Sequence, residues 1–193
     1  MLSDGKKPIP RSRGGQRGVG LLEVLVSLLL TSFGLLALAG LQAKMSQAQF
    51  ESYQRAQAIT LLADMTQRMQ ANSANDASYV TTSPLGTDDT IDCSTQTTRA
   101  KMDQCDWSNA LKGTAEKKSS ISVGAMTGAR GCIELIQASD TATCQPAIYR
   151  STVVWQGLIS TVAPGVSCGQ NLYGSEAQRR AISSQVVTPL SSC

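Results

Sequence analysis

The chain contains no histidine and few aromatic residues, and each shortage narrows what the protein can do. Histidine is the commonest side chain in zinc sites and in acid–base catalysis, so its absence from all 193 residues removes the usual basis for both. No serine or cysteine nucleophile motif is recognisable, and no two cysteines have the C-x-x-C spacing. We therefore expect no enzyme, no metal site and no cofactor. Aromatic residues make up only 4% of the chain, which predicts a thin core that needs disulfides for stability.

The chain also has little net charge outside residues 1–18. Five of the 17 basic residues lie within residues 1–18, against Asp4 alone, so the remaining chain is nearly neutral. A neutral surface gives no general attraction for a polyanion, and we expect no nucleic-acid partner. The basic pairs Lys117–Lys118 and Arg179 with Arg180 are expected to be plain surface rather than a phosphate-binding patch.

A group of three aspartates is a further weak pattern. Asp88, Asp89 and Asp92 have the close spacing of carboxylates that bind calcium. We favour the alternative of a solvated loop, because the surrounding sequence is polar. The tryptophans Trp107 and Trp155 are expected in the core or at subunit contacts.

What the chain does have is one long apolar run. Residues 24–41 carry no charge, and a helix over residues 19–41 would measure about 35 Å, enough to cross a hydrocarbon core of roughly 30 Å. Because the basic residues precede this run, the positive-inside rule keeps residues 1–18 cytoplasmic and exports the chain after about Leu41. The sequence therefore predicts a single-pass inner-membrane protein with a periplasmic C-terminus.

One carboxylate, Glu23, stands directly before this run without an obvious partner. A charged side chain on a membrane-spanning helix costs roughly 2.5–3.5 kcal/mol on insertion scales, so an unpaired one needs an explanation. Cleavage between Gly18 and Val19 would create an α-amino group four residues before Glu23. On a helix, that spacing suits a weak pair within one chain or a pair between neighbouring helices.

At these residues the sequence resembles the class III signal of type IV prepilins and type II secretion pseudopilins. That family has a short basic leader ending in glycine, a cut before a hydrophobic residue, and glutamate as the fifth residue of the product. Gly18, Val19 and Glu23 match these positions. The start Val-Gly-Leu-Leu-Glu-Val and the six cysteines look most like PilV-type minor pilins. The resemblance implies that residues 1–18 are a cleaved leader and that Val19 is N-methylated by the same peptidase.

The resemblance also implies a function and a set of partners. It implies a minor pilin that enters a type IV pilus through its apolar helix and helps to prime pilus assembly at or near the tip. The implied partners are the prepilin peptidase, other minor pilins, the major pilin and a tip adhesin, with inner-membrane lipid around the helix before assembly. After assembly the protein would be part of the pilus at the cell surface.

Two alternatives to this function remain open. A type II secretion pseudopilin has the same signal and the same apolar helix. A soluble periplasmic binding protein would result if signal peptidase cut after Ala39, since Ala37-Leu38-Ala39 satisfies its small-residue rule and residues 24–36 have the length of a signal h-region. That second alternative leaves Glu23 without a purpose.

Beyond the apolar run, the pattern predicts an α+β fold, with a long N-terminal helix packed on an antiparallel sheet of about four strands. This is also the pilin-like arrangement that the resemblance implies. Residues 19–41 form the apolar half of the helix, and residues 42–71 form an amphipathic half. The apolar stripe of the second half is Ala58, Leu62, Met65 and Met69, and Gln54 falls largely elsewhere.

The rest of the chain divides into a connecting region and a sheet region. Residues 72–118 are polar and are expected to form a connecting loop, with a short helical option at residues 104–111. Residues 119–193 are expected to form the sheet and a disulfide-bounded C-terminal region. The predicted strands are residues 119–126, 132–137, 147–158 and 180–187. Gly128 and Gly131 are expected in the hairpin between the first two strands, and residues 140–146 in the turn before the third.

All six cysteines lie on the predicted exported side, and their even number fits disulfides in an oxidising compartment. Six cysteines permit 15 connectivities, and we favour sequential pairing. The expected pairs are Cys93 with Cys105, Cys132 with Cys144, and Cys168 with Cys193. The last pair resembles the disulfide-bounded C-terminal region of pilins.

Overall fold

The computed structural model describes residues 20–113, 117–118, 121–122, 124 and 126–190. The chain divides into two compact units, Met1–Met45 and Ser46–Cys193. The described part of the first unit is helical, and the second unit contains the sheet and the core. The long helix α1 (Leu21–Ala71) contributes residues to both units.

In the second unit, α1 buries one stripe against the sheet. Ala58, Leu62, Met65 and Met69 are 5% exposed or less, as the spacing of four and three residues predicts. Gln54 is also fully buried and extends the same stripe by one helical turn, so its expected place outside the stripe is wrong. The helix ends at Ala71, as the polar sequence after it predicts.

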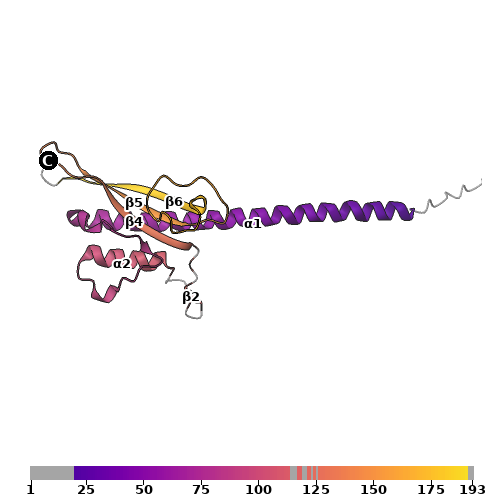
Figure 1. Cartoon of the computed structure of the whole chain (residues 1–193), viewed down its shortest axis with the longest axis horizontal. Helices are drawn as coiled ribbons and strands as arrows, with labels where there is room; N and C mark the ends of the chain where they lie inside the picture. Colours follow the sequence, from indigo (N-terminus) through magenta and orange to yellow (C-terminus); the bar gives the residue numbers. More distant parts are fainter. Residues whose placement is uncertain (1–19, 114–116, 119–120, 123, 125, 191–193) are drawn as a thin grey trace, which may run out of the picture. The chain divides into compact units, whose positions relative to one another are not determined.

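The elements after α1 alternate short 3-10 turns with helix and strand. They are η1 (Ser73–Tyr79), β1 (Leu85–Gly86), η2 (Cys93–Thr95), α2 (Arg99–Leu111), β2 (Lys117–Lys118), β3 (Ile121–Ser122), β4 (Thr127–Gln137), β5 (Ala147–Gln156), η3 (Glu176–Gln178) and β6 (Arg179–Thr188). Strands β1, β4, β5 and β6 form one sheet in that order, and β2 pairs with β3 alone. All pairings are antiparallel (Figure 1).

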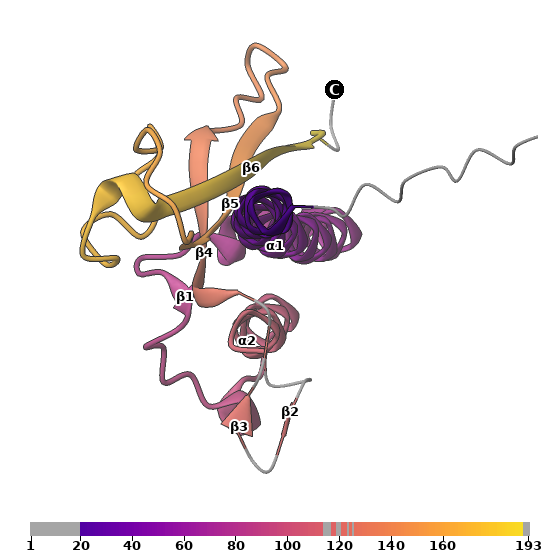
Figure 2. The same cartoon turned by 90° about the vertical axis from the view of Figure 1, so that its right-hand side faces the viewer.

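The arrangement confirms the predicted fold class, an α+β, pilin-like fold with a long N-terminal helix on a four-stranded antiparallel sheet. Figure 2 looks along α1 and shows the strands β4–β6 on one side of the helix and α2 on another. On β5, alternate residues from Ala147 to Trp155 pack against the buried stripe of α1. The residues between them, among them Val154, face a small second core on the opposite side of the sheet.

The predicted first strand, residues 119–126, does not contribute to the four-stranded sheet, and residues 119, 120, 123 and 125 lie outside the described residues. Its position in the sheet is taken by β1, and only Ile121–Ser122 of the predicted segment is a described strand. Gly128 and Gly131 lie within β4 instead of a hairpin turn. Gly131 is required there by close packing, because a Cβ at this position would lie 2.2 Å from Cη2 of Trp107 on α2.

The connecting region is more ordered than the expected loop. Helix α2 starts after Thr98, whose hydroxyl accepts the Lys101 N–H. It begins five residues before the predicted helical option at residues 104–111 and ends at Leu111, as that option does. The predicted Cys93–Cys105 disulfide is confirmed, and it ties η2 to α2.

Helix α2 is attached to α1 by one tryptophan and one buried carboxylate. Trp107 is fully buried, and its Nε1 donates to the Leu61 carbonyl of α1 at 2.8 Å. Asp103 is 1% exposed and accepts hydrogen bonds from the Tyr79 hydroxyl at 2.6 Å and from Arg68 of α1 at 3.0 Å. Burial, and then the bond to Asp103, raises the pKa of Tyr79 to about 12. The tyrosine therefore stays a neutral donor at physiological pH.

Candidate functional site

The N-terminal part of α1 presents an apolar surface. Every residue from 20 to 50 is exposed, and most of the large exposed apolar side chains of the chain lie here. They include Leu21, Leu22, Val24, Leu25, Val26, Leu28, Leu29, Leu30, Phe33, Leu35, Leu36, Leu38, Leu41 and Met45. Among the residues that the structure describes, α1 is the one helix long and apolar enough to cross a membrane. Contiguous apolar surface of this extent marks a site that lipid or another protein covers.

The few hydroxyl groups of this segment find their hydrogen-bond acceptors within the helix. Ser27 Oγ donates to the Glu23 carbonyl and Thr31 Oγ1 to the Ser27 carbonyl, each at 2.7 Å, and Ser32 Oγ donates to the Leu29 carbonyl at 2.8 Å. Because each hydroxyl has a partner on its own helix, none of them needs water. The segment is therefore suited to lipid or to the dry interior of a helix bundle.

Glu23 lies in the first turn of α1 and is exposed. A carboxylate at this position also interacts favourably with the positive end of the helix dipole. Gly18 and Val19 lie outside the described residues. The predicted cleavage between them, the N-methylation of Val19 and the pairing of its α-amino group with Glu23 therefore stay predictions.

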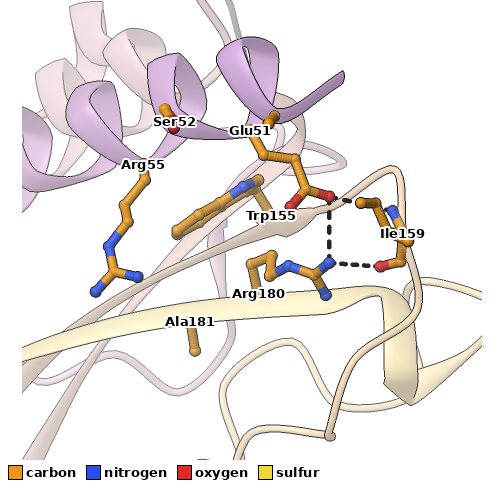
Figure 3. A pocket seen from close by; sticks show the side chains of 8 residues that line it. Glu51, Ser52, Arg55, Trp155, Ile159, Arg180 and Ala181 are labelled. Carbon is orange, nitrogen blue, oxygen red and sulfur yellow. Dashed lines mark hydrogen bonds and ion pairs between the residues drawn. The ribbon is translucent and has the colours of Figure 1, made fainter. Parts of the chain in front are cut away.

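A second site lies in the sheet-bearing unit, where α1 passes the end of β5. Glu51 accepts the backbone N–H groups of Leu158 and Ile159, each at 3.1 Å, and pairs with Arg180 of β6 at 3.2 Å (Figure 3). Arg180 also donates to the Ile159 carbonyl and, at 2.7 Å, to Thr161 Oγ1. The Glu51 and Arg180 side chains are 25% and 16% exposed. The pair therefore fixes the loop after β5 to α1.

This ion pair lies in the wall of a pocket of about 360 Å³. The lining residues are Ala48, Glu51, Ser52 and Arg55 of α1, Trp155 of β5, Ile159 of the following loop, and Arg180 and Ala181 of β6. The four helical residues recur at intervals of three and four and so share one face of α1. Trp155 is only 4% exposed and, like Trp107, belongs to the main core.

Arg179 and Arg180 were expected to be plain surface, and that expectation is wrong. Arg179 is 2% exposed and donates to the carbonyls of Val166 at 2.8 Å and Cys168 at 2.9 Å, while it pairs with Glu176 at 2.6 Å. Neighbouring residues on a strand point to opposite faces of the sheet, so Arg179 and Arg180 bind different parts of the same loop. The hydrogen bond from the Asn171 backbone N–H, and after it the pairing with Arg179, lowers the pKa of Glu176.

Two of the three predicted disulfide pairs are wrong. Cys132 bonds to Cys168, which excludes both the Cys132–Cys144 and the Cys168–Cys193 pairs. Cys144 is disulfide-bonded as well, and Cys193 lies outside the described residues. Cys132 pairs with Cys168 because both belong to the small second core, on the side of the sheet opposite α1. The loop that Arg179 holds brings Cys168 to that core.

The three aspartates do not form a common site. Asp88 pairs with Arg130, Asp89 accepts a hydrogen bond from Ser108 at 2.7 Å, and Asp92 caps η2. Within the part of the chain that the structure describes, no group of three or more histidine, cysteine, aspartate or glutamate side chains is placed to hold a metal ion. Each aspartate thus has its own local structural role.

Sequence reasoning missed the pocket residues Glu51, Arg55 and Arg180. The only signal in the sequence is that Glu51 and Arg55 stand four residues apart on the amphipathic half of the helix, which is ordinary for a solvated helix face. The pocket forms only because the loop after β5 returns to α1, and nothing local in the sequence indicates that return.

Comparison with known proteins finds no relative: no protein-family model, no curated protein and no solved structure matches the chain.

Proposed function

We propose that this protein is a minor pilin, which enters a type IV pilus through the N-terminal half of α1 and takes part in priming pilus assembly at or near the tip. The observation that carries the proposal is the pair of environments along one helix. Residues 21–41 expose a largely apolar surface whose one charged side chain is that of Glu23, whereas the stripe from Gln54 to Met69 is buried against the sheet. One half of the helix is thus free to contact lipid or other subunits, and the other half holds the folded unit.

The proposed mechanism is an exchange of apolar neighbours. Before assembly, lipid covers the exposed apolar surface of α1, and in the fibre the corresponding helices of other subunits cover it. Because neither state exposes this surface to water, extraction from the membrane avoids the cost of hydrating it. The internally bonded hydroxyls of Ser27, Thr31 and Ser32 keep this exchange free of unsatisfied polar groups.

In this mechanism, Glu23 pairs with the new N-terminal amino group during assembly. In the proposal, the prepilin peptidase cuts between Gly18 and Val19 and methylates the new amino group. The carboxylate of Glu23 then neutralises that amino group, on its own chain or on a neighbouring subunit, as the helix leaves the membrane. Two charges in an apolar medium are tolerable only when they are paired. The partners of this step are the major pilin and the other minor pilins, with a tip adhesin as a further partner.

The first test is the N-terminus of the exported protein. The proposal expects N-methyl-Val19 in Edman sequencing or intact-mass analysis of the full chain expressed together with a prepilin peptidase. An N-terminus at Gly40 would instead identify a soluble protein released by signal peptidase, and retention of the 18-residue leader would contradict processing altogether.

The second test is incorporation into fibres. Sheared surface fibres should contain the protein if it is a pilin, whereas a type II secretion pseudopilin would be missing from them. The Glu23→Gln variant should be cut but lost from the fibres. The matched control is Ser27→Ala, one helical turn further along, because its hydroxyl only bonds its own helix and its removal should leave incorporation unchanged. Equal incorporation of the two variants would exclude a role for the carboxylate.

A further inference from the structure

We propose that the pocket between α1 and the end of the sheet binds an acidic segment of a partner protein, in which an aspartate or glutamate stands beside an apolar side chain. The inference concerns residues 48–181 only and does not depend on processing or on incorporation into a fibre. The volume of the pocket, about 360 Å³, lies at the lower end of the range for ligand pockets, roughly 300–1,000 Å³.

The charges in the pocket are unequal. Two guanidinium groups, of Arg55 and Arg180, face one carboxylate, of Glu51. The Glu51 carboxylate and the Arg180 guanidinium are paired with each other and are further bound to the loop after β5. By contrast, no hydrogen bond or ion pair joins Arg55 to any residue that the structure describes. The pocket therefore retains one uncompensated positive charge.

Arg55 lines the pocket and is exposed, so its charge is open to an incoming group. Figure 3 shows its side chain reaching from α1 toward β6, beside Trp155 and away from the dashed contacts of Glu51 and Arg180. An incoming carboxylate would accept a charge-assisted, bidentate pair of hydrogen bonds from this guanidinium. The same pocket is also lined by Ala48, Trp155 and Ala181, which offer apolar surface to the group that carries the carboxylate.

The surroundings of the pocket favour a polypeptide over a small molecule. Ile159 lines the pocket and is still 50% exposed, and the same loop exposes 52% of Leu158 and 90% of Val162. A small acid inside the pocket would leave these apolar side chains in water. A peptide that places its carboxylate on Arg55 would also cover part of the loop, since the loop is held against the pocket by Glu51.

The test uses the full chain in lipid nanodiscs, labelled with ¹⁵N-tryptophan. The chain has two tryptophans, so it gives two indole N–H signals, one from the pocket and one from the buried Trp107. The probe is the blocked peptide acetyl-Ala-Leu-Glu-Leu-Ala-amide, whose only charge is the glutamate, and its counterpart with glutamine in place of glutamate. The glutamate peptide should shift the Trp155 signal and leave the Trp107 signal in place, and added salt should weaken the binding.

Arg55→Gln should weaken binding of the glutamate peptide by about tenfold or more, the loss expected for a charge-assisted hydrogen bond. Lys44→Gln, which removes another exposed cation from the same helix, should leave the affinity unchanged. Equal binding of the two peptides, or full binding by Arg55→Gln, would overturn the proposal. So would binding of hexanoate as tight as that of the glutamate peptide, which would identify a small acid as the ligand. A Trp155 shift that grows with protein concentration alone would identify a second copy of this chain.

Discussion

Replacing Asp103 by asparagine should weaken the attachment of α2 to α1 and so lower the stability of the folded unit. Asp103 is the meeting point of three donors: the Tyr79 hydroxyl at 2.6 Å, Arg68 at 3.0 Å and Arg99 at 3.1 Å. The Asp103 side chain is 2% exposed, whereas Arg68 is 27% and Arg99 67% exposed. Asparagine keeps an acceptor for Tyr79 but removes the charge that both arginines face.

The magnitude follows from these exposures. A hydrogen bond to a charged group contributes about 1.5–3 kcal/mol, and a pair with a largely exposed arginine contributes about 1 kcal/mol or less. The bond to Arg68 falls in the first class and the pair with Arg99 in the second. We therefore expect Asp103→Asn to lower the free energy of unfolding by about 2–3 kcal/mol.

Asp106→Asn is the matched control. Asp106 lies on the same helix and contacts the same Arg68 atom, but at 3.4 Å and with 60% of its side chain exposed. Its replacement should cost about 0.5 kcal/mol or less. Urea unfolding of the full chain in detergent, followed by tryptophan emission, measures both, because Trp107 loses its buried site when α2 separates. Equal midpoints for the two variants would refute the assignment of this energy to the buried carboxylate.

Three further changes test other parts of the fold. Replacing both Cys132 and Cys168 by alanine should cost about 3–4 kcal/mol, since the bond closes a separation of 36 residues, and unreduced peptide mapping should recover that pair. The pKa of Tyr79 is about 12 in the folded protein and about 10 in the unfolded chain, so the stability that the neutral tyrosine contributes below pH 10 is lost as the pH rises from 10 to 12. Tyr79→Phe should therefore lose less stability over this pH range than the unchanged protein does. Gly131→Ala should cost about 1–3 kcal/mol in urea unfolding, because its Cβ overlaps the ring of Trp107.

Each of these changes has an outcome that would contradict its reasoning. A peptide linking Cys132 to Cys144 would contradict the observed pairing. Tyr53, which is 57% exposed, provides the control for the pH series, and Tyr53→Phe should leave the alkaline limb unchanged. Gly165→Ala, where a Cβ meets nothing within 4 Å, should be neutral, and an equal cost at Gly165 would rule out close packing as the cause at Gly131.

The features predicted from sequence are those encoded by local periodicity. The stripe at Ala58, Leu62, Met65 and Met69 repeats at the helical period, and its burial follows from that repeat alone. Strands β5 and β6 carry runs of β-branched residues and were found within a few residues of their true ends. The fold class follows from these elements, because the apolar stripe of the helix and the apolar face of the sheet must both be buried, and packing them on each other does so.

The features that were missed depend on distant partners. Strand β1 has only two residues and no pattern of its own, and it is a strand because Leu85 pairs with Gly131 of β4. Gln54 was placed by its polarity, yet its position one turn before Ala58 is what buries it. The Cys132–Cys168 bond joins residues that become neighbours only after the sheet and the following loop have formed.

The two candidate sites also differ in whether they depend on consecutive or on distant residues. The exposed apolar half of α1 and Glu23 are readable from the sequence because they involve consecutive residues. The pocket requires Glu51, Trp155 and Arg180, which come from three elements, and the sequence contains no pattern that links them.

The adjacent arginines Arg179 and Arg180 of β6 also limit where the protein can accept the insertion or deletion of a single residue. An inserted or deleted codon should be tolerated in the turn near Asp140 or in the loop between β5 and β6, but one at the start of β6 would move the arginines there to the opposite faces of the sheet. The guanidinium of Arg179 would then point toward α1, and that of Arg180 toward the Cys132–Cys168 bond. Point substitutions in this strand are therefore expected to be far better tolerated than single-residue indels, which a deep mutational library that contains both classes would measure directly.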